Sequence, residues 1–183
     1  MPSTHLSLHY HLVFSTKDRL PIITSAWREH LHAYLGGIVK KIDGIPEAIG
    51  GTNDHVHLLI GLRATHCLAD VVRDIKAASS RWAHEKIGEH SATWQDGYGA
   101  FTVGAPQCGD VCDYISRQEE HHRKQTFQQE YLDFLRRGAV EYDCAVAPWN
   151  TTSAICGEIS AAPPGAWPAG HLIPGVPLRF TPG

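Results

Sequence analysis

The sequence Gly50-Gly51-Thr52-Asn53-Asp54-His55-Val56-His57-Leu58-Leu59-Ile60-Gly61 decides the fold of this chain. Its apolar, β-favouring core is bounded by glycines, which predicts a buried strand entered through a polar turn. Because side chains alternate along a strand, His55 and His57 project from the same face, about 7 Å apart. Two imidazoles on one rigid surface are typical ligands of a divalent metal ion, and a third ligand must then come from elsewhere in the fold. The alternative is a partly buried histidine pair whose hydrogen bonds are satisfied within the protein.

The composition is that of a globular protein. The chain has 183 residues, of which 43% are hydrophobic and 19% charged, enough for one compact domain of about 140 residues with a peripheral tail. No apolar run approaches the roughly 20 residues of a membrane span, and the start of the chain lacks the pattern of a secretory signal. Five cysteines in no disulfide-like arrangement fit a reducing compartment. We therefore expect a cytoplasmic protein without a membrane partner.

Hydrophobic periodicity alternates between strands and helices along the first hundred residues. It predicts strands at 5–15, 45–49, 55–62 and 97–104, and amphipathic helices at 25–41 and 68–87. The glycine-containing turn between the second and third strands predicts an antiparallel hairpin. This β-α-β-β-α-β order predicts an α+β, ferredoxin-like fold, in which two helices cover one face of a four-stranded antiparallel sheet. The opposite face is then left for a ligand, a partner or a second sheet.

The C-terminal part changes in character. Two further helices are predicted at 110–124 and 126–137, and after them the chain is rich in Pro, Gly, Ala and Thr without sustained periodicity. We therefore expect one domain over residues 1–143 and a flexible tail over residues 144–183.

The first of these added helices carries a second informative pattern, Asp110-Val111-Cys112-Asp113-Tyr114-Ile115-Ser116-Arg117-Gln118-Glu119-Glu120-His121-His122. Tyr114 and Gln118 are four residues apart, so they share one face of a continuous helix, and His121 extends that face. A tyrosine can attack phosphorus to form a covalent phosphotyrosine, and a metal ion can orient and neutralise the phosphate. The amide oxygen of Gln118 is a hard ligand that could complete a set with His55 and His57. The alternative is that Tyr114 packs against the sheet and Gln118 faces solvent.

Three stretches together resemble the single-tyrosine transposases of the HUH endonuclease superfamily, which include the transposases of the smallest bacterial insertion sequences and the REP-associated tyrosine transposases. These stretches are Asp54-His55-Val56-His57-Leu58-Leu59, Trp94-Gln95-Asp96-Gly97-Tyr98-Gly99-Ala100-Phe101 and Tyr114-Ile115-Ser116-Arg117-Gln118-Glu119-Glu120-His121-His122. The opening Tyr10-His11-Leu12-Val13-Phe14-Ser15-Thr16-Lys17 is similar too. The resemblance covers about residues 5–143, and three motifs in the expected order are far more specific than any one of them.

The resemblance implies an enzyme that cuts and rejoins single-stranded DNA at hairpin ends through a 5′-phosphotyrosine intermediate. It implies that His55 and His57 bind the metal, that Gln118 is the third ligand and that Tyr114 is the nucleophile. Mg²⁺ or Mn²⁺ is the implied ion. In the insertion-sequence members the enzyme is a homodimer, in which the tyrosine helix of one subunit completes the metal site of the other.

Two features of the sequence depart from this family. Arg117 stands where a small polar residue, often Asn, is expected. The formal net charge of −3 is unusual for a DNA enzyme. The surface that contacts phosphates must then come from local groups of basic residues, namely Lys40, Lys41, Arg63, Arg73, Lys76, Arg81, Arg123, Lys124, Arg136 and Arg137.

Three other functions compete with this one. Cys108 and Cys112, followed by His121 and His122, could bind structural zinc. A histidine-triad nucleotide hydrolase needs a third histidine at position 59, which is Leu59, so that function is excluded. The remaining alternative is a ferredoxin-like module, such as a domesticated transposase, that binds nucleic acid without catalysis. Such modules display stacking aromatic residues on the open sheet face, where this chain offers histidines.

Overall fold

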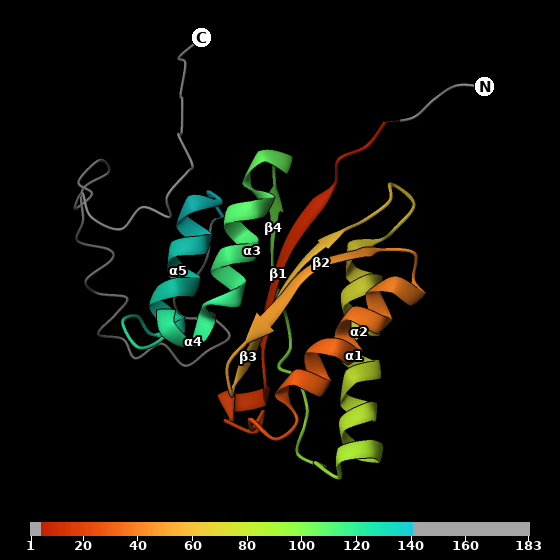
Figure 1. The fold of residues 1–183 in the computed structure, drawn as a ribbon, viewed down its shortest axis with the longest axis vertical. Helices are drawn as coiled ribbons and strands as arrows, with labels where there is room; N and C mark the ends of the chain where they lie inside the picture. The colour runs from red at the N-terminus through yellow and green to blue at the C-terminus, as the bar shows by residue number, and fades with distance from the viewer. Residues whose placement is uncertain (1–4, 141–183) are drawn as a thin grey trace.

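The computed structural model describes residues 5–140, which form one antiparallel sheet with helices on both faces (Figure 1). The strand order is β2-β3-β1-β4. The strands are β1 (His9–Ser15), β2 (Ile45–Gly51), β3 (His55–Gly61) and β4 (Gly99–Val103). The two helices that connect these strands are α1 (Arg28–Lys41) and α2 (Leu68–Trp82). This element order and topology confirm the predicted α+β, ferredoxin-like fold.

The larger core lies between the sheet and the helices α1 and α2. Leu12, Leu58 and Ile60 point from the strands into this layer and are fully buried. Leu35 of α1 and Ile75 of α2 meet them there, also fully buried. Burying one such side chain stabilises a fold by about 1.5–3 kcal/mol. This layer therefore anchors the sheet that carries the side chains on the opposite face.

The β2–β3 hairpin is tight enough to require a glycine at its turn. A Cβ atom on Gly51 would lie 2.2 Å from the carbonyl oxygen of His55, far closer than van der Waals contact. Beyond this turn, β3 runs between β2 and β1 and pairs with both in antiparallel register. Every residue of β3 is buried, so the hairpin fixes the position and direction of each side chain on this central strand.

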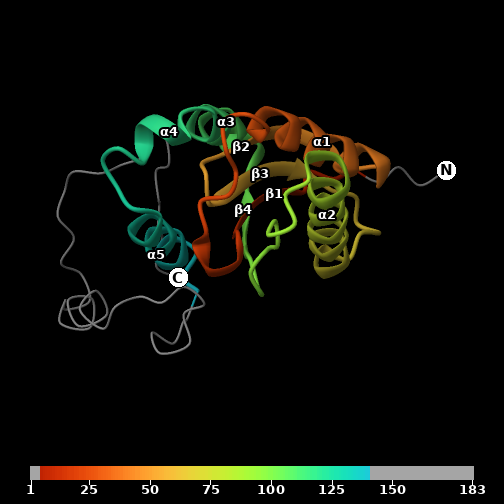
Figure 2. The same ribbon diagram turned by 90° about the horizontal axis from the view of Figure 1, so that it is seen from below.

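The second face of the sheet is covered by the chain's own C-terminal helices. These are α3 (Cys108–Ser116), α4 (Gln118–His121) and α5 (Phe127–Arg137), and they lie across the sheet from α1 and α2 in both views (Figures 1 and 2). A small second core forms there from Val13 of β1 with Phe127 and Tyr131 of α5. The expectation of a face left for a ligand, a partner or a second sheet was therefore wrong, because apolar side chains on this face hold the added helices.

Several helix boundaries differ from the predicted ones. The helix predicted over 25–41 begins at Arg28, and the one predicted over 68–87 changes at Ala83 into a π-helical turn, η2 (Ala83–Ile87). The helix predicted over 110–124 is interrupted at Arg117, whose φ of −107° and ψ of 21° are not helical. Short 3₁₀ turns, η1 (Lys17–Arg19) and η3 (Ala105–Gln107), follow β1 and β4.

Some predictions fall partly or wholly outside the described residues. The domain boundary at residue 143 and the tail over 144–183 lie beyond residue 140, where the description ends. Within residues 5–140, none of the helices has the length and apolar character needed to cross a membrane. Cys67, Cys108 and Cys112 are free thiols.

Candidate active site

The strand β3 holds His55 and His57 toward the helices α3 to α5. Their side chains are 1% and 0% exposed, and their ring centroids lie 5.1 Å apart. The two imidazoles share a face, as strand alternation predicts. Since β3 is an inner strand paired on both sides, the backbone that carries the two rings is fixed by the sheet.

His55 is oriented by the residues of the hairpin turn. Its Nδ1 lies 2.7 Å from Oδ1 of Asp54 and 2.9 Å from the hydroxyl of Thr52. Burial by itself would raise the pKa of Asp54, but the hydrogen bond from His55 and the nearby guanidinium of Arg19 together hold that pKa well below its usual value. Because the ionised Asp54 accepts a hydrogen from Nδ1, the lone pair of His55 stands on Nε2. Nε2 is buried without a hydrogen-bond partner among residues 5–140.

His57 is oriented by a histidine that the sequence analysis did not single out. Its Nδ1 lies 2.9 Å from Nε2 of His11 on β1, and the two rings are stacked with centroids 5.1 Å apart. The tautomer of His57 that donates from Nδ1 leaves the lone pair on Nε2, which is also buried and unpartnered within the described chain. Burial lowers the pKa of His11 to about 4 and that of His57 well below 6.5. Both imidazoles are therefore neutral at pH 7, the form that binds metal ions.

Tyr114 reaches the same place from α3. Its ring is edge-on to His57, His11 and His121, with centroid distances of 5.8, 6.1 and 5.2 Å. Its hydroxyl is buried and has no hydrogen-bond partner among the described residues. A phenol without a partner, set among imidazoles, is an unusual feature for a purely structural tyrosine, because buried hydroxyls are normally hydrogen-bonded.

Gln118 begins α4, directly after the interruption at Arg117, and is 2% exposed. Its Nε2 donates to Oε1 of Glu130 at 3.3 Å, and its Oε1 is left without a hydrogen-bond partner in the described chain. The premise of one continuous helix was therefore wrong, although both Tyr114 and Gln118 face the histidines. The structure thus brings His55, His57, Tyr114 and Gln118 together within one chain.

Two further side chains near this cluster were missed by the sequence analysis. The ligand atoms of His55, His57, His122 and Glu130 all lie within 4.8 Å of one another. Burial lowers the pKa of His122 to about 4, with a smaller contribution from the neighbouring His55, while burial raises the pKa of Glu130 to about 9. The Glu-Glu-His-His run at 119–122 contains His122 but did not show which side chains point inward, and no pattern singled out Glu130.

These observations test whether a divalent ion fits the site. A buried lone pair without a partner costs free energy, and each expected ligand carries one such atom: Nε2 of His55, Nε2 of His57 and Oε1 of Gln118. Two neutral imidazoles and a carboxamide oxygen form a ligand set that divalent metals accept. The donor set therefore fits a metal ion.

The sequence was compared with models of known protein families. The family model described as "Transposase IS200 like" matches residues 4–118, well over half of the chain. The chain belongs to the IS200-like transposase family. This confirms the resemblance to the single-tyrosine transposases of the HUH superfamily.

Two solved structures are similar to this transposase. One is a candidate transposase from Deinococcus radiodurans R1, 24% identical, with a TM-score of 0.50 over 64% of this chain and 96% of that one. The other is a REP-associated tyrosine transposase bound to a REP hairpin, 13% identical, with a TM-score of 0.49 over 67% of this chain and 74% of that one. The first supports the fold. No curated protein matches the chain.

The zinc site that competed as an alternative is not assembled among residues 5–140. Cys108 lies with His9 and Glu47, and these three ligand atoms come within 4.8 Å of one another. His121 and His122 instead face Glu130 on α5. The alternative of a Cys₂His₂ zinc site is therefore not supported, because Cys108 lies beside His9 and Glu47 while the two histidines face Glu130.

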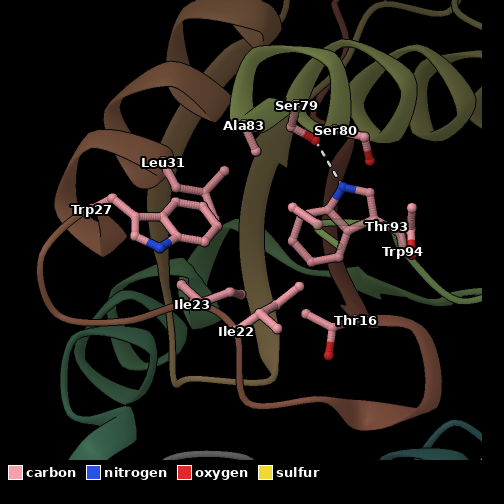
Figure 3. Close-up of a pocket in the computed structure, with 11 residues that line it drawn as sticks. Thr16, Ile22, Ile23, Trp27, Leu31, Ser79, Ser80, Ala83, Thr93 and Trp94 are labelled. Atoms are coloured by element: carbon pink, nitrogen blue, oxygen red, sulfur yellow. Dashed lines mark hydrogen bonds between the residues drawn. The ribbon is translucent and has the colours of Figure 1, made fainter. Parts of the chain in front are cut away.

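A separate pocket lies in the layer of α1 and α2 (Figure 3). Trp27 and Leu31 of α1 line it, together with Trp94, whose indole nitrogen donates to the hydroxyl of Ser79 at 2.8 Å. Its lining contains no acidic, basic or thiol side chain. This pocket therefore offers no ionisable side chain, whereas the histidine cluster on the other face of the sheet offers several.

Proposed function

We propose that this transposase cuts and rejoins single-stranded DNA at hairpin ends, with Tyr114 as the nucleophile. The observation that carries the proposal is the unpartnered phenol of Tyr114, held beside the His57 ring within the same chain. The substrate class is inferred from the resemblance to the single-tyrosine transposases, whose members act on single-stranded DNA.

The proposed reaction needs no external energy source. The phenolic oxygen of Tyr114 gives up its proton to solvent and forms a bond to phosphorus, while the bond from phosphorus to the 3′ oxygen breaks and that oxygen takes up one proton from solvent. The products are a 5′-phosphotyrosine and a DNA end with a free 3′-OH. A different 3′-OH then attacks the same phosphorus and releases the tyrosine, so the energy of the phosphodiester is kept in the covalent link.

His55, His57 and Gln118 are the residues that we propose to hold the metal ion. Their unpartnered atoms are two imidazole nitrogens and one carboxamide oxygen. A bound Mg²⁺ or Mn²⁺ would orient the scissile phosphate and neutralise its charge. The carboxylate of Asp54 supports this role, because it fixes the tautomer of His55.

Access to this site requires a change in the C-terminal helices. The hydroxyl of Tyr114 is buried, and α5 packs over the same face of the sheet. A DNA phosphate can reach the phenol only when α3 or α5 shifts. We propose that binding of the hairpin brings about this shift.

We also propose that the enzyme acts in the cytoplasm, because its proposed substrate is DNA.

Some of the basic residues expected to contact phosphate are already engaged. Arg73 pairs with Asp70 and Asp74, and the ammonium of Lys76 donates to the carbonyl oxygens of Gln95 and Gly97. We propose that the DNA surface consists of the basic residues near α3 to α5, Arg123, Lys124, Arg136 and Arg137, because they lie on the elements around the proposed site; of these, Arg136 also pairs with Asp133.

A homodimer remains part of the proposal, but the chemistry does not depend on it. Because Tyr114 lies beside His57 of its own chain, one copy supplies all the proposed residues. Light scattering coupled to size-exclusion chromatography, with and without hairpin DNA, measures whether two copies associate.

The central test is covalent capture of labelled DNA. We expect the purified full chain, incubated with single-stranded hairpins and Mn²⁺ or Mg²⁺, to give a protein–DNA species that survives denaturation. A label at the 3′ end of the DNA should be found in this covalent species. A label at the 5′ end should instead be found on a released fragment that ends in 3′-OH. Binding of every hairpin without a covalent species would favour the non-catalytic binding module instead.

A second prediction tests how α3 is positioned. A Cβ atom on Gly50 would lie 2.5 Å from the carbonyl oxygen of Ile115, so Gly50→Ala must push α3, and with it Tyr114, away from β2. A displacement of about 1 Å can cost about a hundredfold in rate, and we expect a loss of that order in the rate of adduct formation. The matched control is Gly37→Ala, where nothing lies within 4 Å of the added atom. Equal rates for the two variants would show that close packing of α3 on β2 is not needed.

A further inference from the structure

The side chain of Glu130 occupies an unusual position on α5. The helix is held independently of any metal by a capping box, in which Thr126 and Gln129 exchange hydrogen bonds. Phe127 and Tyr131, on either side of Glu130 in this helix, pack in the small core with Val13. This packing leaves Glu130 only 3% exposed and turned toward the histidines. Its position is thus built into the fold.

The carboxylate of Glu130 is surrounded by imidazoles. Its Oε2 lies 3.3 Å from Nε2 of His122 and 3.6 Å from Nε2 of His57. Its Oε1 lies 3.4 Å from Nε2 of His121 and accepts the hydrogen bond from Gln118. Oε2 has no hydrogen-bond partner among residues 5–140, and the imidazole nitrogens of His122 and His57 face it.

A carboxylate buried among neutral imidazoles is costly unless a cation accompanies it. The ligand atoms of His55, His57 and Glu130 lie within 4.8 Å of one another. Two ligands that each stand about 2.1 Å from one ion are at most about 4.2 Å apart. Only a small side-chain movement would therefore bring all three atoms into the coordination shell of a single ion.

We propose that Glu130 is a carboxylate ligand of the same metal ion as His55 and His57. This inference rests on the proposed metal site and adds to it a ligand from α5. Gln118, which donates to the other oxygen of Glu130, then also orients the carboxylate. The metal thereby links the central strand to the last described helix.

The proposal has a consequence for the choice of ion. Two imidazole nitrogens beside two oxygen ligands suit a transition metal better than Mg²⁺, which prefers oxygen ligands and keeps several waters. We therefore expect the metal-free full chain to bind Mn²⁺ at least about tenfold more tightly than Mg²⁺.

The test is a Mn²⁺ titration followed by electron paramagnetic resonance, which measures free Mn²⁺ directly. Glu130→Gln keeps the shape and the hydrogen bonding of the side chain but removes its charge, and we expect Mn²⁺ to bind at least about tenfold more weakly. Glu120→Gln is the matched control, because Glu120 is exposed on the neighbouring α4, and we expect its Mn²⁺ affinity to equal that of the wild type. Circular dichroism verifies that each variant is folded.

The outcomes separate this inference from the proposed function. If Glu130→Gln binds Mn²⁺ as tightly as the wild type, Glu130 has only a structural role and the inference fails, while the site on His55 and His57 stands. If the wild type binds no Mn²⁺, both fail. If Glu130→Gln does not fold, Glu130→Asp replaces it, since this variant keeps the charge on a side chain shorter by one methylene. We again expect Mn²⁺ to bind at least about tenfold more weakly. Binding as tight as that of the wild type would again contradict the inference.

Discussion

Replacing Tyr114 with phenylalanine is expected to abolish the covalent DNA species while leaving DNA binding almost unchanged. The substitution removes only the phenolic oxygen, and that oxygen has no hydrogen-bond partner among the described residues. The ring contacts with His57 and Phe134 are kept, so the free energy of unfolding should change little. Loss of the nucleophile should lower the cleavage rate at least about a thousandfold. Denaturing gels measure the adduct, and fluorescence anisotropy with a labelled hairpin measures binding.

Tyr34→Phe is the control for this substitution. Tyr34 lies on α1, in the other layer, where its ring stacks on Trp82 with centroids 5.0 Å apart. The same atom is removed there without touching the histidine cluster, so cleavage should proceed at the wild-type rate. A denaturation-resistant adduct formed by Tyr114→Phe would show that another residue is the nucleophile.

The histidine pair could be predicted from the sequence because its geometry is local. Alternation along a strand puts His55 and His57 on one face whatever the strand packs against. The turn before β3 is equally local, since the close approach at Gly51 follows from the hairpin itself. The fold class followed from the order of such segments, and the structure confirms it.

The rest of the candidate site depends on how segments distant in the sequence pack together. Hydrophobic periodicity predicts single helices and strands but not this packing. His11 meets His57 only because β1 pairs with β3, and Glu130 enters the site only because α5 lies across the sheet. The break at Arg117 has no local signal, since residues 110–124 contain neither proline nor glycine. The sequence analysis placed Tyr114 and Gln118 on one face by assuming a continuous helix. Both side chains do face the histidines, but the helix is interrupted at Arg117 between them.

His57→Ala is expected to remove both metal binding and metal-dependent cleavage. His57 supplies one of the two β3 imidazole nitrogens that are buried without a hydrogen-bond partner among the described residues, and His55 alone cannot replace it. In the wild type, Mn²⁺ at a hundred times its dissociation constant should stabilise the fold by about 2.7 kcal/mol. For a chain of this size that raises the melting temperature by about 5–10 °C. In His57→Ala we expect no such rise, measured by thermal unfolding with and without Mn²⁺, and no cleavage of hairpin DNA.

Leu59→Ala separates this effect from simple loss of packing. Leu59 is fully buried two positions further along β3, on the same face as His57, and its truncation should cost about 2–5 kcal/mol. The melting temperature of the metal-free Leu59→Ala protein should therefore fall, while its rise on addition of Mn²⁺ should persist because every proposed ligand is still present. If His57→Ala kept the Mn²⁺-dependent rise, or if Leu59→Ala lost it, the cavity rather than the imidazole would govern metal binding, and the ligand role of His57 would have to be given up.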